Sequence, residues 1–134
     1  MVINARLSEK GKKWALKKNA EFKAVYDVHK AKSDRYMVMY VAQNFFDHNR
    51  IGVSVSKKVA NSVMRHRLGR LAKEAFRLNM QRFSSGWDIV LVMRANANPK
   101  KGSGLKKLTF SDIERSLLKL GKAHHILKQE EYTI

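Results

Sequence analysis

The side chains best suited to chemistry form a run of cations between residues 50 and 77. The run contains one acid, Glu74, and its members are Arg50, Lys57, Lys58, Arg65, Arg67, Arg70, Lys73 and Arg77. Like charges at helical spacing destabilise a helix, so a phosphate ligand explains the run better than packing does. The planar guanidinium group of arginine matches phosphate oxygens. The run therefore predicts a nucleic-acid contact that weakens as the salt concentration rises.

The charge of the whole chain supports this interpretation. The 134 residues include 28 Lys and Arg against 11 Asp and Glu, a formal net charge of +17. Such a field attracts polyanions, which include nucleic acids, anionic membranes and acidic proteins. No apolar run approaches the roughly 20 residues of a membrane-spanning helix, and residues 1–13 lack the apolar core of a signal peptide. We therefore expect a cytoplasmic protein without a membrane partner, which leaves nucleic acid as the favoured polyanion.

Few residues are suited to catalysis by the chain itself. Cysteine is absent, which excludes disulfides and thiolate metal sites. The acids are scattered along the chain, and no pair resembles a two-metal nuclease or a general acid and base. His124 and His125 are adjacent and lack two further ligands for zinc. We expect no catalytic residue, no protein metal site and no intrinsic cofactor.

The first elements expected are a helix and a strand. The helix begins at Asn19 as its cap, ends near Lys32, and carries an amphipathic stripe. The stripe consists of Phe22, Val25, Tyr26 and His29. Residues 36–42 alternate as a strand, with Met37, Met39 and Val41 on one face and Tyr36, Val38 and Tyr40 on the other.

Residues 50–56 form a second expected strand, joined to the first by a turn at 44–49. The polar tip of this turn is Asp47, His48 and Asn49. If this short connection forms a hairpin, the two strands pair antiparallel. Ile51, Val53 and Val55 point into the core. The opposite face is small and polar, so another group could approach the backbone closely there; it consists of Arg50, Gly52, Ser54 and Ser56.

The second part of the cation run, from Arg65 to Arg77, lies on a long helix expected at residues 60–83, capped by Asn61 or Ser62. Its apolar stripe is Met64, Leu68, Leu71, Ala75 and Leu78, with His66, Arg70, Lys73 and Arg77 on the opposite side. Residues 88–93 are apolar without alternation, which predicts a strand covered on both faces. Strand, helix and strand in this order suggest a βαβ unit and an α+β fold.

The remaining sequence predicts a basic loop and a final helix within one domain of residues 1–134. The loop spans residues 96–104. The helix starts at Thr109 or Ser111, and Ser111 with Glu114 matches a capping box. Its buried face is Ile113, Leu117, Leu118 and Leu120. Residues 1–16 are expected to form a basic N-terminal arm and residues 121–134 a flexible tail.

The central block resembles the signature of the bacterial ribonuclease P protein family. The matching segments are SVSKKV (54–59), VMRHRL (63–68), Arg70 and Ala75-Phe76. Weaker likenesses at 17–26, 34–40, 88–92 and 109–110, together with the final helix, extend the resemblance over about residues 16–120. One departure is His66, where the family has asparagine between its two arginines; imidazole still donates and accepts hydrogen bonds.

The resemblance implies an RNA-based tRNA-processing enzyme in which the RNA subunit performs the hydrolysis with magnesium bound through RNA. It implies a two-layer α/β sandwich, a small mixed sheet and a left-handed βαβ crossover. It places a set of residues against the catalytic RNA: Arg65, His66, Arg67, Arg70 and Lys73. It places a second set in a cleft for the single-stranded 5′ leader of precursor tRNA: Phe22, Tyr26, Tyr40, Arg50, Lys57 and Lys58. The three aromatic residues could equally belong to the core. The oligomeric state expected in the holoenzyme is a monomer.

Three other functions remain open from the sequence. The chain could be a ribosomal or other structural RNA-binding protein of similar fold. It could be a DNA-binding architectural protein, although the block begins in a strand rather than in a helix-turn-helix pair. It could be an autonomous nuclease, which the scattered carboxylates disfavour.

Overall fold

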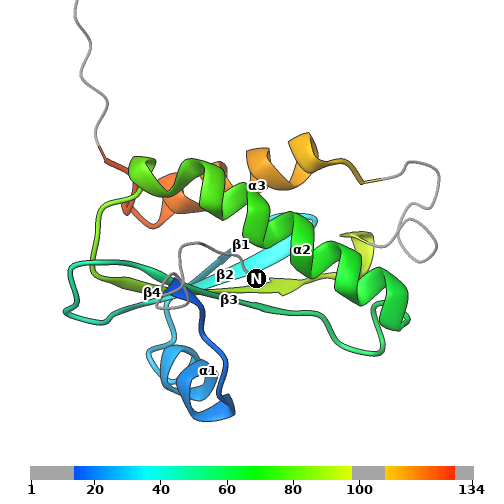
Figure 1. Cartoon of the computed structure of the whole chain (residues 1–134), viewed down its shortest axis with the longest axis horizontal. Helices are drawn as coiled ribbons and strands as arrows, with labels where there is room; N and C mark the ends of the chain where they lie inside the picture. The colour runs from blue at the N-terminus through cyan, green and yellow to red at the C-terminus, as the bar shows by residue number, and fades with distance from the viewer. Residues whose placement is uncertain (1–13, 98–107, 129–134) are drawn as a thin grey trace, which may run out of the picture.

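A four-stranded sheet with helices on both faces forms the body of the molecule (Figure 1). The computed structural model describes residues 14–97 and 108–128. The helices are α1 (Asn19–Tyr26), α2 (Ser62–Asn79) and α3 (Phe110–Ala123), and the strands are β1 (Ala31–Ser33), β2 (Met37–Gln43), β3 (Arg50–Ser54) and β4 (Trp87–Met93). Short 3₁₀ turns cover Met80–Arg82 and Ala95–Ala97. Helices α2 and α3 cover one face, and α1 lies on the other. The predicted α+β class with a small mixed sheet is confirmed.

The strand order β1-β2-β4-β3 corrects one prediction. Strands β2 and β3 do not pair as a hairpin, because β4 lies between them, antiparallel to β2 and parallel to β3. The physical reason lies in the composition of β4. Ile89, Val90 and Leu91 are fully buried, and a strand that is apolar on both faces is best covered at the centre of a sheet. The predicted βαβ unit of β3, α2 and β4 is confirmed, and the handedness of its crossover stays a prediction.

The main core lies between the sheet and helices α2 and α3. Met37, Met39 and Val41 of β2 are buried in it, as their alternation predicts. Helix α2 contributes Leu68, Ala72, Ala75 and Phe76, and α3 contributes Ile113, Leu117 and Leu120. Leu78 was expected in the apolar stripe of α2 but is 48% exposed, and Phe76 takes its place in the core.

Helix α1 is shorter than its amphipathic stripe predicts. It ends at Tyr26, and His29 lies beyond it in the left-handed backbone region, with φ of 64°. Ala31–Ser33 instead forms edge strand β1, which the sequence did not show because all three residues are exposed. Asn19 does not cap α1. The Glu21 carboxylate accepts hydrogen bonds from the Lys17 and Lys18 amides at 2.8 and 2.9 Å, and these bonds lower its pKa.

The caps of the other two helices were predicted with mixed success. Asn61 caps α2, since its side-chain oxygen accepts a hydrogen bond from the Met64 amide at 2.9 Å. Helix α3 uses Thr109 with Asp112 as its capping box, so the expected pair of Ser111 and Glu114 is wrong. The Glu114 carboxylate instead accepts a hydrogen bond from the buried Asn79 amide at 2.8 Å, which joins α3 to the end of α2.

Two segments expected at the periphery belong to the packed body. Trp14 and Leu16, placed in the N-terminal arm, are buried, and the Leu16 amide donates to the Ile51 carbonyl at 2.9 Å. This hydrogen bond covers the outer edge of β3. Residues 121–128, placed in the flexible tail, continue α3 and then return to the core, where Ile126 is fully buried. The rest of the arm and tail, and the basic loop from residue 98, lie outside the described residues.

Protonation of His124 is expected to destabilise the fold. Its Nε2 lies 2.8 Å from the Met39 carbonyl oxygen, which can only accept, so the neutral ring donates there. Burial lowers the pKa of His124, and the charges of Lys30 and Lys32 lower it further. The unfolded chain therefore takes up a proton first, and the free energy of unfolding should fall as the pH drops below about 6.5.

Urea denaturation at pH 7.5, 6.5 and 5.5 checks this prediction. His124→Gln should show a weaker dependence on pH than the parent chain, because its amide cannot titrate. His125→Asn is the control, since His125 is exposed and asparagine suits its positive φ of 62°. An unchanged pH dependence in His124→Gln would contradict the assignment.

Candidate RNA interface

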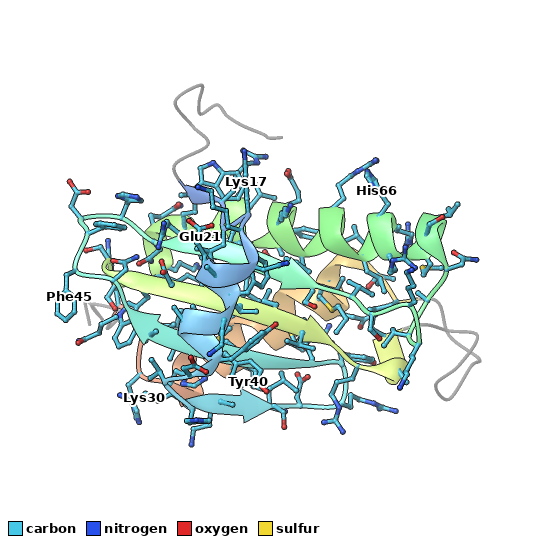
Figure 2. The ribbon with its side chains drawn as sticks, turned by 90° about the horizontal axis from the view of Figure 1, so that it is seen from below. Lys17, Glu21, Lys30, Tyr40, Phe45 and His66 are labelled. Carbon is cyan, nitrogen blue, oxygen red and sulfur yellow. The ribbon has the colours of Figure 1, made fainter. Side chains whose placement is uncertain are left out.

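Apart from Arg77, which pairs with Glu74, the basic side chains of α2 divide into an exposed row and two flanking arginines. His66, Arg70 and Lys73 are exposed, and we call them the α2 cation face; Figure 2 shows His66 pointing outward from the helix. Arg65 and Arg67 are half-buried on either side. One Nη of Arg65 donates to the Ala60 carbonyl at 3.2 Å, and one of Arg67 donates to the Leu108 carbonyl at 3.3 Å. Because both acceptors are neutral, they orient the guanidinium groups without neutralising their charge.

The α2 cation face borders an open hollow of about 720 Å³. The hollow is lined by Ser62, Val63, His66, Arg67, Arg70 and Leu71. Val63 is 78% exposed at its edge. A hollow with cations around a partly apolar floor can take the backbone of a nucleic acid.

Lys73 extends the same surface toward the N-terminal segment. Although the Lys73 side chain is exposed, neighbouring protein atoms partly desolvate its ammonium group and lower its pKa, and the positive charge of Lys17 lowers it further. In residues 14–97 and 108–128, neither ammonium group forms an ion pair with a carboxylate. An anion bound between them would relieve this repulsion. Arg77 differs, because its guanidinium already pairs with Glu74 at 3.0 Å.

A second concave surface lies between α1 and the sheet, on the face opposite α2. This α1 groove has a volume of about 550 Å³ and is lined by Lys17, Asn19, Phe22, Lys23, Tyr26, Val53, Ser54 and Val55. Beside the groove, the Phe22 ring packs directly over Gly52 of β3, where a Cβ atom would lie 2.5 Å from the ring. The close approach predicted for the small, polar face of β3 is therefore made by Phe22.

The three predicted aromatic residues are shared between packing and the groove. Phe22 and Tyr26 are half-buried against the small cluster of Leu16, Val25, Ala42 and Val90, and both also line the groove. Tyr40 packs edge-on against Tyr26, with ring centroids 4.9 Å apart. Tyr40 supports the groove wall through this packing and does not itself line the groove.

The predicted cations of the cleft lie elsewhere. The Arg50 guanidinium donates to both oxygens of Asp88, at 2.8 and 2.7 Å, and this pairing raises its pKa. Arg50 therefore forms a structural ion pair with Asp88 beside the groove. Lys57 and Lys58 are exposed in the turn after β3 and do not line the groove. Lys17 and Lys23 supply the positive charge of the groove in their place. Lys23 also forms an exposed ion pair with Asp27. The amphipathic stripe of α1 could have indicated Lys23, since Lys23 and Tyr26 of the stripe are three residues apart and are therefore neighbours on the helix surface.

Comparison with known proteins decides between the candidate families. A family model described as Ribonuclease P matches residues 11–124. The chain belongs to the ribonuclease P protein family. It is similar to the ribonuclease P protein component of Lachnoclostridium phytofermentans, with 44% identity over 117 residues that cover 87% of this chain and 94% of the relative.

Solved structures of the family share the fold. The ribonuclease P protein of Staphylococcus aureus matches with a TM-score of 0.73 and 29% identity, covering 86% of this chain and 98% of that one. The protein from Thermotoga maritima matches with a TM-score of 0.70 and 27% identity, covering 81% and 96%. A ribonuclease P protein component is part of an RNA-based tRNA-processing enzyme, so the family implies an RNA partner. None of the described helices is long and apolar enough to cross a membrane.

Proposed function

We propose that this chain binds the catalytic RNA of ribonuclease P through α2 and holds the 5′ leader of precursor tRNA in the α1 groove. The observation that carries the proposal is the presence of two separate surfaces on opposite faces of the sheet. One presents a row of cations on a helix, and the other lines a basic groove with aromatic rings. Regular RNA duplexes are bound through their backbone, whereas single strands are bound by aromatic platforms in basic grooves.

The α1 groove suits binding rather than bond cleavage. Among the described residues, those that line it include no carboxylate and no imidazole, the side chains that most often serve as general bases. We therefore place the phosphodiester hydrolysis in the RNA subunit, with magnesium held through RNA phosphates. The chain contributes affinity for the leader and for the RNA subunit, in a cytoplasmic holoenzyme that contains one copy of it.

The groove also accounts for tolerance of many precursors. Stacking on an aromatic ring accepts every base, because each base has a π-face. Phe22 and Tyr26 supply rings, and Lys17 supplies charge for the leader backbone. An enzyme that processes many tRNAs needs this tolerance.

Loss of the Phe22 ring is expected to weaken leader binding selectively. Phe22→Leu keeps an apolar group against Gly52 and removes the π-face. Its holoenzyme should bind precursor tRNA more weakly by about 1–3 kcal/mol, while binding of mature tRNA stays unchanged. The measurement compares the two dissociation constants at one salt concentration. Equal losses for both tRNAs, with an unchanged melting temperature, would remove Phe22 from the leader site.

The main alternative is a structural RNA-binding protein of the same fold. Such a protein would bind structured RNA through α2 and would not distinguish precursor from mature tRNA. Affinities for structured RNA and duplex DNA at matched salt test the DNA-binding alternative, and tighter binding of the duplex would favour it.

A further inference from the structure

The loop between β2 and β3 presents two aromatic rings at one end of the molecule. The turn at 44–49 was expected to carry a polar tip, but Asn49 is buried, and its side chain bonds to the Ser84 carbonyl and the Trp87 amide, both at 2.8 Å. Phe45 is instead the most exposed large apolar side chain of the described residues, at 87%. Figure 2 shows it pointing away from the body, far along the molecule from His66.

The loop that carries Phe45 is held in place by the hydrogen bonds of Asn44. The Asn44 side chain accepts a hydrogen bond from the Phe46 amide at 2.8 Å and donates to Asp88 at 2.8 Å and to the His48 carbonyl at 3.3 Å. The Asn44 amide donates to the Gly86 carbonyl at 2.8 Å. Phe45 itself has φ of 62°, a conformation that phenylalanine rarely adopts. The fold thus holds an apolar ring in water at the expense of backbone strain, which points to a use for the ring.

Phe46 and its neighbours show which ligand chemistry fits the loop. The Phe46 ring stacks on the His48 imidazole, with centroids 5.3 Å apart and planes within 7° of parallel. The Arg50 guanidinium lies 5.0 Å from the Phe46 centroid. Flat rings and a guanidinium that lie against one another can accept a further flat ring by stacking. The loop's acid, Asp47, lies 3.1 Å from His48 Nδ1, and the chain as a whole carries +17, so a ligand that combines a flat ring with negative charge is favoured.

We propose that the Phe45 loop is a second stacking site, which takes an unpaired base of the precursor's leader beyond the stretch held in the α1 groove. The position of Arg50 supports the leader as the ligand of this loop. The guanidinium that lies against Phe46 is also 3.4 Å from the Glu21 carboxylate in the first turn of α1. The loop is thereby linked to the helix that forms the groove wall. The leader is single-stranded, so its bases are free to stack. The inference rests on the proposed function, since it assumes that the groove holds a leader.

The test compares holoenzymes carrying Phe45→Ala, Phe45→Leu and Phe45→Trp. Precursor tRNAs with leaders of increasing length, and mature tRNA, serve as probes. Phe45→Ala and Phe45→Leu should each bind the long-leader precursor about 5- to 150-fold more weakly, the range for one base on one aromatic ring. Phe45→Trp should bind the long-leader precursor as tightly as the parent chain does. The fluorescence of its added indole should be quenched by the long-leader precursor and not by the other RNAs. Mature tRNA and the shortest leader should bind all four proteins equally.

Several results would overturn the inference. If Phe45→Leu binds like the parent chain, the interaction is apolar rather than a stack. If all variants bind every precursor equally, the loop does not touch the leader, and an exposed aromatic loop would then suit a protein partner. If the loss instead concerns the RNA subunit alone, the base comes from that RNA. In each case the parent holoenzyme still prefers precursor over mature tRNA; loss of that preference in the parent would instead overturn the proposed function.

Discussion

Replacement of Asp88 by alanine is expected to lower the free energy of unfolding by about 3–5 kcal/mol, the usual cost of breaking a buried ion pair from one side. Asp88 is the second residue of β4 and lies directly opposite Arg50 of β3 in the parallel register. Its side chain is 11% exposed and accepts bonds from the Arg50 Nε and Nη2 atoms and from Asn44. Without the carboxylate, the Arg50 charge remains partly buried and the β2–β3 loop loses an anchor.

Chemical denaturation of three variants measures this effect. Asp88→Ala is compared with Arg50→Met and with the double variant. The double variant removes both partners of the Arg50–Asp88 pair, so neither of the two is left as an unpaired charge, and it should be more stable than the sum of the two single effects predicts. Glu74→Ala is the matched control. This substitution breaks the surface ion pair between Glu74 and Arg77, two side chains that are both more than 40% exposed. It should lower the free energy of unfolding by at most about 1 kcal/mol. Similar destabilisation by Asp88→Ala and Glu74→Ala would show that the Arg50 pair is not structural.

Removal of two charges from the α2 cation face is expected to produce the largest drop in RNA affinity. In Arg70→Ala/Lys73→Ala, two exposed side chains are truncated and the core stays intact. The plot of log binding constant against log salt should become less steep by about 0.7–0.9 for each phosphate that is no longer neutralised. At one low salt concentration, affinity for the RNA subunit should fall by about 30- to 1000-fold, if each charge-assisted hydrogen bond contributes about 1–2 kcal/mol.

Arg77→Ala controls for the removal of positive charge from the same helix. Arg77 lies on the same side of α2 as Arg70 and Lys73, but Glu74 already neutralises it. Its replacement should change the salt dependence little. Binding of the RNA subunit by filter retention over a range of salt concentrations gives both slopes. Equal slopes for the double variant and the parent would exclude the α2 cation face from the RNA interface.

The sequence predicted best where burial dictates residue type. The alternation of β2, the unbroken apolar run of β4 and most of the stripe of α2 each have one stable placement in a packed core, and the structure confirms them. The pairing of β3 was predicted wrongly because a short loop favours a hairpin locally, whereas burial of β4 on both faces is a property of the whole sheet. The sequence of strand β1 shows no alternation of apolar and polar residues, since the strand is stabilised by backbone hydrogen bonds to β2.

The site residues divide in the same way. The exposure of His66, Arg70 and Lys73 followed from helical periodicity. The engagement of Arg50 by Asp88 could not be read from the chain, because the two residues are 38 positions apart and meet only through the parallel register. The exposure of Phe45 was missed because the sequence of a loop does not show where a side chain points. The hydrogen bonds of Asn44 and Asn49 fix the turn and thereby the direction of Phe45.

The most direct test of the proposed function is cleavage of precursor tRNA by a bacterial ribonuclease P RNA at limiting magnesium, with and without this chain. RNA from a clostridial relative is the first choice, because the similar protein components come from such organisms. The proposed function predicts that the chain restores cleavage at the correct 5′ site and that the chain without RNA cleaves nothing. Tight RNA binding by the folded chain without stimulation, or cleavage by the RNA-free chain, would contradict it.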